Sequence, residues 1–121
     1  MILLYISKIY WLDIGTGEAI VRVTDGNYEL ECYMSNCNYK VGDCVKTDIE
    51  VLGVEKVELT SEKNQVKYSS MENGSLIVGN LQEIGRLKIG GLFINIGVEN
   101  IPKDLHKGED VIVKISRLDI W

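Results

Sequence analysis

The chain has 121 residues, of which 45% are hydrophobic and 26% are charged, and its formal net charge is −5. This length favours a single domain that can bury a core without disulfides or metals. The acidic balance argues against a surface built mainly to hold phosphates, because nucleic-acid-binding domains usually carry a basic face.

The N-terminal run Met1–Ile6 is apolar but short, and polar residues follow it at once. It lacks a basic leader and is far shorter than the roughly 18 apolar residues that a membrane span requires. We expect a buried strand here, no membrane segment and a cytoplasmic location.

Strand signals continue through residues 19–34. Apolar and mostly polar side chains alternate over residues 28–34, which is typical of a half-buried strand. The run 19–23 precedes it. Asp25-Gly26 lies between the two runs and favours a hairpin, because these residues tolerate a positive φ.

The three cysteines are Cys32, Cys37 and Cys44, and their odd number and spacing match no disulfide framework or zinc motif. Reduced thiols are typical of a cytosolic protein. Cys32 is expected in the core and Cys44 at the start of a strand. Cys37 lies in a polar turn and is, of the three thiols, the one best placed to be exposed and reactive, although a structural or incidental use is favoured for each of them.

Residues 45–52 alternate again, and residues 55–59 are predicted to return as a short strand. Residues 60–74 are mostly polar and form the best candidate for a linker or long loop. Further on, residues 86–89 and 92–96 predict a hairpin across Gly90-Gly91, and residues 111–121 predict a long strand. Sustained helical periodicity is absent, so the pattern indicates a small all-β barrel or sandwich.

One pattern occurs twice. Tyr39–Val45 contains a glycine and an acid before a strand, and Leu105–Val111 repeats this arrangement 66 residues later. Glycine supplies the turn geometry, and the acid accepts hydrogen bonds from nearby backbone donors. The repeat predicts two related halves, 1–60 and 61–121, that share a core. One elaborated barrel over 1–121 is the alternative.

The segments 39–59 and 105–118 resemble the fourth strand, and the short strand after it, of OB-fold (oligonucleotide/oligosaccharide-binding) RNA-binding domains. The resemblance covers about a quarter of the chain. It implies an OB-like or SH3-like barrel and, in that family, a face that stacks bases on aromatic side chains and holds phosphates with basic ones. The residues of this sequence that suit such a face are Arg86, Lys88, Phe93, Lys114 and Arg117. The favoured explanation is that they are ordinary outward side chains of half-buried strands.

Residues 1–60 carry ten acids and five bases, whereas residues 61–121 carry eight of each. Such asymmetry marks either a solvated acidic face or a partner-facing surface. Several aromatic residues join the acids, and tyrosine and tryptophan serve in protein interfaces as well as in small cores. The predicted interaction surface consists of Tyr5, Tyr10, Trp11, Glu29, Glu31, Tyr33 and Trp121.

Reactive constellations are absent from the sequence. His106 is the only histidine, no nucleophile, metal or phosphate-loop motif surrounds any candidate, and no cofactor is implied. We therefore expect a non-catalytic interaction module with no metal that binds a protein partner, including a second copy of the chain. Binding of single-stranded RNA or DNA is the alternative.

Overall fold

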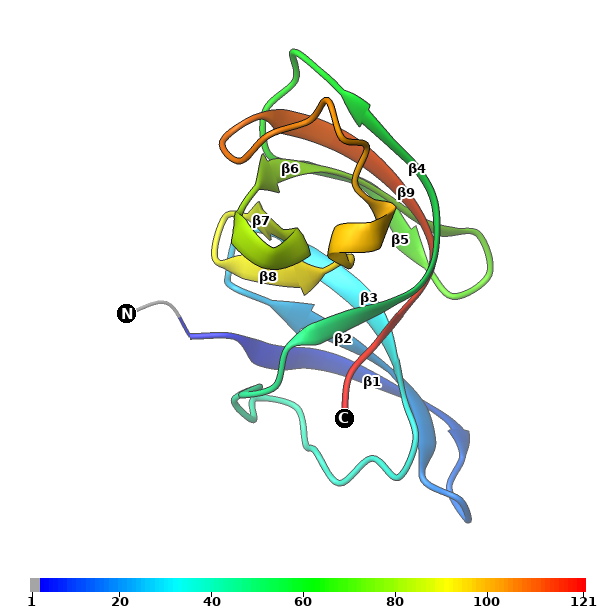
Figure 1. Ribbon diagram of the computed structural model, residues 1–121. Helices are drawn as coiled ribbons and strands as arrows, with labels where there is room; N and C mark the ends of the chain where they lie inside the picture. The colour runs from blue at the N-terminus through cyan, green and yellow to red at the C-terminus, as the bar shows by residue number, and fades with distance from the viewer. Residues whose placement is uncertain (1–2) are drawn as a thin grey trace.

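The computed structural model describes residues 3–121 and shows an all-β protein, as the sequence predicted (Figure 1). Within that range the only helices are two short 3₁₀ turns, η1 (Glu83–Gly85) and η2 (Val98–Asn100). The strands are β1 (Tyr5–Asp13), β2 (Glu18–Thr24), β3 (Glu29–Met34), β4 (Ile49–Leu59), β5 (Gln65–Ser70), β6 (Gly74–Leu81), β7 (Arg86–Ile89), β8 (Leu92–Asn95) and β9 (Asp110–Asp119).

Five strands close a small barrel, which confirms the predicted barrel architecture. The order is β9-β4-β8-β7-β6, and β6 pairs with β9 to complete the circle. Every pairing is antiparallel except that of β4 with β8. Closure satisfies the backbone of both edges of the sheet, which an open sheet leaves exposed.

The strands β1, β2 and β3 form an antiparallel meander outside the barrel (Figure 1). It joins the barrel through one parallel pair, Tyr33 with Asp119, and through the Ile120 N–H, which donates to the Tyr33 carbonyl oxygen at 3.0 Å. The long strand β9 therefore pairs with β3, β4 and β6.

One cluster of buried side chains fills the barrel and continues under the meander. Alternation explains it: Val111, Val113 and Ile115 of β9 are fully buried, while Lys114 between them is exposed. Residues from both 1–60 and 61–121 contribute to this cluster. The division into two related halves stays a prediction.

The turn 40–43 covers the first part of β1. Its closing bond joins the Asp43 N–H to the Lys40 carbonyl oxygen at 3.0 Å, and the Asp43 carboxylate accepts the Lys40 N–H at 2.8 Å. Gly42 has φ 95°, a conformation that favours glycine. Gly42 donates to the Ile6 carbonyl oxygen (2.7 Å), and the Ile6 N–H donates to Asp43 (2.9 Å).

The turn 106–109 repeats this geometry bond for bond at the end of β6. The Glu109 N–H donates to the His106 carbonyl oxygen (3.1 Å), and the Glu109 carboxylate accepts the backbone N–H of His106 (2.6 Å). Gly108 has φ 93° and donates to Leu81 (2.8 Å), whose N–H donates to Glu109 (2.9 Å). The sequence repeat thus corresponds to a repeated turn that docks on another strand.

The structure corrects three expectations. Residues 45–48 are irregular, and the strand begins only at Ile49. The supposed linker contains β5, which forms a hairpin with β6. Of the predicted buried strand Met1–Ile6, Met1 and Ile2 lie outside the described residues. Tyr5 is exposed and Ile6 is fully buried, because neighbouring side chains of a strand point to opposite faces of the sheet. No helix within residues 3–121 is long and apolar enough to cross a bilayer.

Candidate functional site

The outer edge of β1 is open over most of its length. Segment 42–45 covers the edge at the start of β1. The backbone of Ile6 is bonded to this segment, and the Val45 N–H donates to the Leu4 carbonyl oxygen at 2.8 Å. Within residues 3–121, nothing pairs with the outer edge of residues 8–13. Tyr10, Trp11 and Leu12 in this stretch are 42%, 46% and 54% exposed. The edge therefore offers unpaired backbone groups beside large apolar side chains.

The outer face of the meander gathers most of the predicted interaction surface. Strand register places Tyr10 and Tyr33 on either side of Ile20, in one row across the three strands. The next row includes Arg22 of β2. The members of the predicted surface that share this face are Tyr5, Tyr10, Glu29, Glu31 and Tyr33. Trp11, by the same register, lies on the opposite face.

The acids of this face are engaged within the molecule. Arg22 lies 3.3 Å from a Glu29 oxygen and 3.8 Å from a Glu31 oxygen. Ser7 donates to Glu29 (2.7 Å), and the Met71 N–H donates to Glu31 (3.0 Å). Since these carboxylates already have partners, the aromatic side chains are the more available part of the surface.

Tyr33 is held on both sides. Its hydroxyl donates to Glu18 at 2.9 Å, and this hydrogen bond raises the pKa of the phenol because it favours the protonated form. The Arg117 guanidinium lies 4.5 Å from the centre of the ring. Trp121 was expected to pack against the protein or to form a subunit contact. The packing expectation is wrong, because β9 ends at Asp119 and the Trp121 side chain is 65% exposed.

The five basic and aromatic residues predicted for nucleic acid divide into two groups. Arg86, Lys88 and Phe93 come together on the β7–β8 hairpin, where Lys88 and Phe93 are cross-strand partners. The Arg86 guanidinium lies 4.6 Å and the Lys88 amine 5.8 Å from the centre of the Phe93 ring. Such distances are typical of cation–π contacts.

Lys114 and Arg117 lie on β9 and do not extend this cluster. Lys114 lies 3.9 Å from a Glu55 oxygen. Arg117 donates to both oxygens of Asp119, at 2.7 and 2.8 Å, and these bonds raise the pKa of the guanidinium. The five residues that the sequence offered for a nucleic-acid-binding face therefore do not form one cluster, and the two on β9 lie beside acidic partners.

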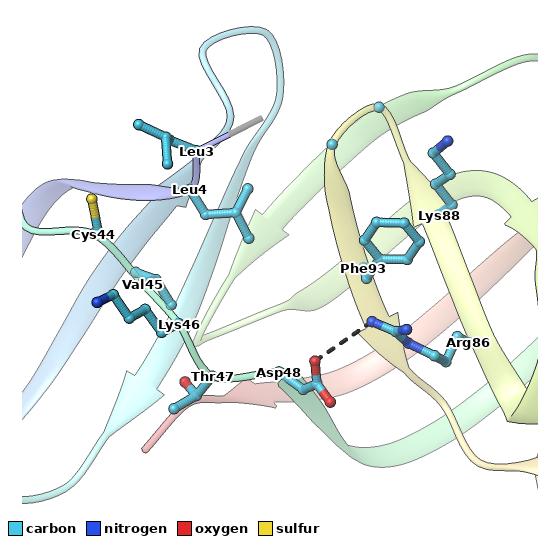
Figure 2. A pocket seen from close by; sticks show the side chains of 12 residues that line it. Leu3, Leu4, Cys44, Val45, Lys46, Thr47, Asp48, Arg86, Lys88 and Phe93 are labelled. Atoms are coloured by element: carbon cyan, nitrogen blue, oxygen red, sulfur yellow. Dashed lines mark ion pairs between the residues drawn. The ribbon is translucent and has the colours of Figure 1, made fainter. Parts of the chain in front are cut away.

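A pocket of about 750 Å³ lies beside the β7–β8 hairpin. Phe93 lines one side of it, and Leu4 and Val45 line the other (Figure 2). Arg86 reaches across toward Asp48, with 3.5 Å between the guanidinium nitrogen and the carboxylate oxygen. The pocket therefore has apolar walls and one ion pair spanning it.

The turn of this hairpin is fixed by Asp25 of the β2–β3 turn. The Asp25 carboxylate accepts the Gly91 N–H at 2.7 Å, together with the N–H groups of Asn27 and Tyr28. Partial burial opposes ionisation of Asp25, but these three hydrogen bonds outweigh it and lower the pKa of the carboxyl. One wall of the pocket is thus bonded to the meander.

Sequence reasoning missed the other wall. Leu4, Val45 and Asp48 belong to segments that were assigned to strands, and no local pattern places them opposite residues 86–93. The hydroxyl oxygen of Thr47, in the same segment, is buried and has no hydrogen-bond partner among the described residues. An irregular segment with a buried hydroxyl is a feature that alternation does not reveal.

The cysteines differ from expectation at two positions, since Cys44 is followed by an irregular segment instead of opening a strand. Cys37 is 9% exposed and belongs to the core, because its N–H donates to the Gly17 carbonyl oxygen at 2.8 Å and holds the loop against the β1–β2 turn. The expectation of an exposed Cys37 is therefore wrong, and Cys44 is the exposed thiol. Cys32 is fully buried as predicted, and burial raises the pKa of its thiol.

His106 is exposed in the turn that docks on Leu81. In the part of the chain that the structure describes, no three His, Cys, Asp or Glu side chains are grouped so that they could hold a metal ion.

The chain was compared with protein-family models, with curated proteins and with solved structures, and none of them matches it.

Proposed function

We propose that this protein is a non-catalytic interaction module that binds a protein partner along the outer edge of β1. The observation that carries the proposal is the open stretch of residues 8–13, with Tyr10, Trp11 and Leu12 exposed beside it. An unpaired strand edge is a template for an added strand from another chain. Backbone hydrogen bonds would supply affinity, and the aromatic side chains would supply contact area.

Natural proteins commonly protect such edges with prolines or clustered charges. Here the stretch from Lys8 to Asp13 has one charged residue at each end and four uncharged residues, Ile9–Leu12, between them. Register irregularities interrupt β1 between Ile6 and Lys8 and between Trp11 and Asp13, so the regular, uncharged part of the edge is short. Its large apolar side chains support an edge that is covered in use. The partner would be an extended segment that alternates apolar and polar side chains, because β1 presents side chains to both faces of the sheet.

The test is site-specific photocrosslinking in cells that produce the protein. A benzophenone amino acid is placed at Tyr10, and the control places it at Glu58, an exposed position of β4 in the barrel. We expect the Tyr10 probe to give a discrete adduct that Trp11→Lys removes. A band of twice the mass would identify a second copy as the partner. Equal labelling from Glu58, or no adduct from Tyr10, would contradict the proposal.

A second candidate is binding of single-stranded nucleic acid, which is favoured by the placement of Arg86 and Lys88 around Phe93. Aromatic side chains flanked by bases suit stacked nucleotides. Anisotropy titration of mixed-sequence oligonucleotides at low salt tests it, since screening is then minimal. Binding that Arg86→Gln weakens and Lys114→Gln does not would support this function, and an absence of binding would reject it.

A further inference from the structure

We propose that the pocket between Leu4 and Phe93 binds a small amphipathic acid, that is, an apolar aliphatic or aromatic body carrying one carboxylate or sulfonate. This function is separate from the open part of the β1 edge, because none of residues 8–13 lines the pocket.

The size of the pocket fits a small molecule. Its volume of about 750 Å³ lies within the range of roughly 300–1,000 Å³ that is typical of ligand sites. Such sites are mostly apolar, with a few polar groups that fix the orientation of the ligand. Here Leu4 and Val45 lie across the opening from the Phe93 ring (Figure 2), and Leu3 also lines the pocket.

Both walls are held by hydrogen bonds within the protein, so the pocket exists without the ligand. Val45 donates to the Leu4 carbonyl oxygen (2.8 Å), which ties segment 44–48 to the irregular residues that precede β1. On the other side, Gly91 is bonded to Asp25 at 2.7 Å. The Tyr28 ring packs so closely against Gly90 that a Cβ there would lie 2.6 Å from a ring carbon. A preformed site avoids the ordering cost of binding.

The charge of the lining selects an acid. Three bases, Lys46, Arg86 and Lys88, line the pocket and only one acid, Asp48, does so, although the whole chain carries −5. Among residues 3–121, neither Lys46 nor Lys88 has a carboxylate within 4.0 Å. Lys46 extends away from Phe93 in Figure 2, so the two bases nearest to the ring are Arg86 and Lys88.

Arg86 is the group that would hold the acid. Its contact with Asp48 is 3.5 Å long, and both side chains are well exposed, at 41% and 63%. Exposed ion pairs of this kind contribute little stability. A ligand carboxylate could therefore take the place of Asp48 and accept paired N–H bonds from the guanidinium, whose planar fork suits a carboxylate. The apolar body would then lie between Leu4 and Phe93.

The experiment uses a matched pair of fluorescent probes on the full chain. Anilinonaphthalene sulfonate has an apolar body and an acid, and phenylnaphthylamine has the same body without the acid. We expect one saturable site for the sulfonate that decanoate displaces. The double variant Arg86→Gln/Lys88→Gln should weaken sulfonate and decanoate binding about tenfold or more, because charged hydrogen bonds are lost, and should change phenylnaphthylamine binding less than about twofold.

The control is Lys114→Gln, which removes one positive charge from β9, outside the pocket, and should leave both probes unchanged. Phe93→Ala should weaken both probes, and its thermal melting shows whether the variant is folded. If Phe93→Ala is unfolded, the test still stands on Arg86→Gln/Lys88→Gln and on Lys114→Gln, because these variants replace solvent-accessible side chains.

Three outcomes would overturn the proposal. The first is sulfonate binding that is unsaturable or unaffected by Arg86→Gln/Lys88→Gln. The second is an equal loss of both probes in that variant. The third is displacement of the sulfonate by a short oligonucleotide but not by decanoate, which would assign the pocket to nucleic acid.

Discussion

The closed barrel and the β1–β3 meander treat their strand edges differently. Each barrel strand has a neighbour on both sides, whereas β1 has a neighbour on one side only over residues 8–13. The buried cluster is continuous through both regions. The barrel strands close on one another, although β4 pairs with β8 only through Ile49 and Glu50. Among the described residues, the two end strands of the sheet, β1 in the meander and β5 beside β6, each keep one edge without a strand neighbour. Stability and recognition are therefore expected to respond to different substitutions.

The largest effect is expected from a charge in the barrel. Val113 of β9 and Ile49 of β4 are fully buried. Val113→Asp or Ile49→Asp should each cost on the order of 4 kcal/mol or more, because a carboxylate would be buried without a partner. Such a loss approaches the whole stability of a small domain. Circular dichroism during thermal unfolding should show loss of the cooperative transition. Unchanged melting would contradict the inward assignment of that position, and Lys114→Gln serves as the exposed control.

The next effect concerns Asp25, which bonds the β2–β3 turn to the β7–β8 turn. Asp25→Ala removes the acceptor of three N–H groups, including that of Gly91 in the barrel. We expect a loss of about 2 kcal/mol in the free energy of urea unfolding. Asp25→Asn, which retains one acceptor oxygen, should cost less. Equal stability of Asp25→Ala and the wild type would mean that the two regions are not joined through this carboxylate.

The same carboxylate predicts a pH dependence. Its folded pKa is lowered, so its contribution is present above the unfolded value of about 3.9 and is lost as the pH falls through the folded pKa. The difference in unfolding free energy between wild type and Asp25→Ala should therefore be constant near neutral pH and shrink below about pH 4. A difference that grows on acidification would contradict the direction of the shift.

A smaller effect is expected in the two equivalent turns. Gly42 and Gly108 have φ values of 95° and 93°, and no atom lies within 4 Å of a Cβ built on either. Alanine at either position should cost about 1 kcal/mol, from backbone strain alone. Gly15→Ala is the control, since Gly15 lies outside the left-handed region. A clear difference between the two turns in urea unfolding would show that they are not energetically equivalent.

The smallest effect on stability is expected at the open edge. Trp11→Lys should change the free energy of unfolding by about 0.5 kcal/mol or less, since partly exposed side chains contribute little to folding. The same variant should abolish the crosslink from Tyr10. A loss of stability as large as that of Asp25→Ala would mean that Trp11 serves packing instead of recognition.

The sequence predicted the features that depend on near neighbours. Asp25-Gly26 and Gly90-Gly91 both form the expected hairpins, and the alternation over residues 111–115 gives the observed buried face. The hairpin also brings Lys88 opposite Phe93, so this part of the candidate site was accessible from local pattern.

The features that depend on distant neighbours were not predictable. The burial of Cys37 follows from its bond to Gly17, and the separation of Arg117 from the basic cluster follows from its bond to Asp119 and from its place on β9. The pocket requires segment 44–48 to face residues 86–93, and no local sequence pattern in either stretch predicts that they lie together. A single sequence contains no co-varying pairs that would show such contacts.

The three partners of β9 have a consequence for synthesis on the ribosome. Translation proceeds from β1 to β9. The strands β3, β4 and β6 therefore cannot form their pairings with β9 until β9, the last of the strands, has been synthesised. Loop-closure entropy must be overcome before such distant pairings form. We expect ribosome-arrested chains to remain protease-sensitive until Asp110–Asp119 has left the exit tunnel. Resistance in shorter nascent chains would show that the earlier strands fold without it.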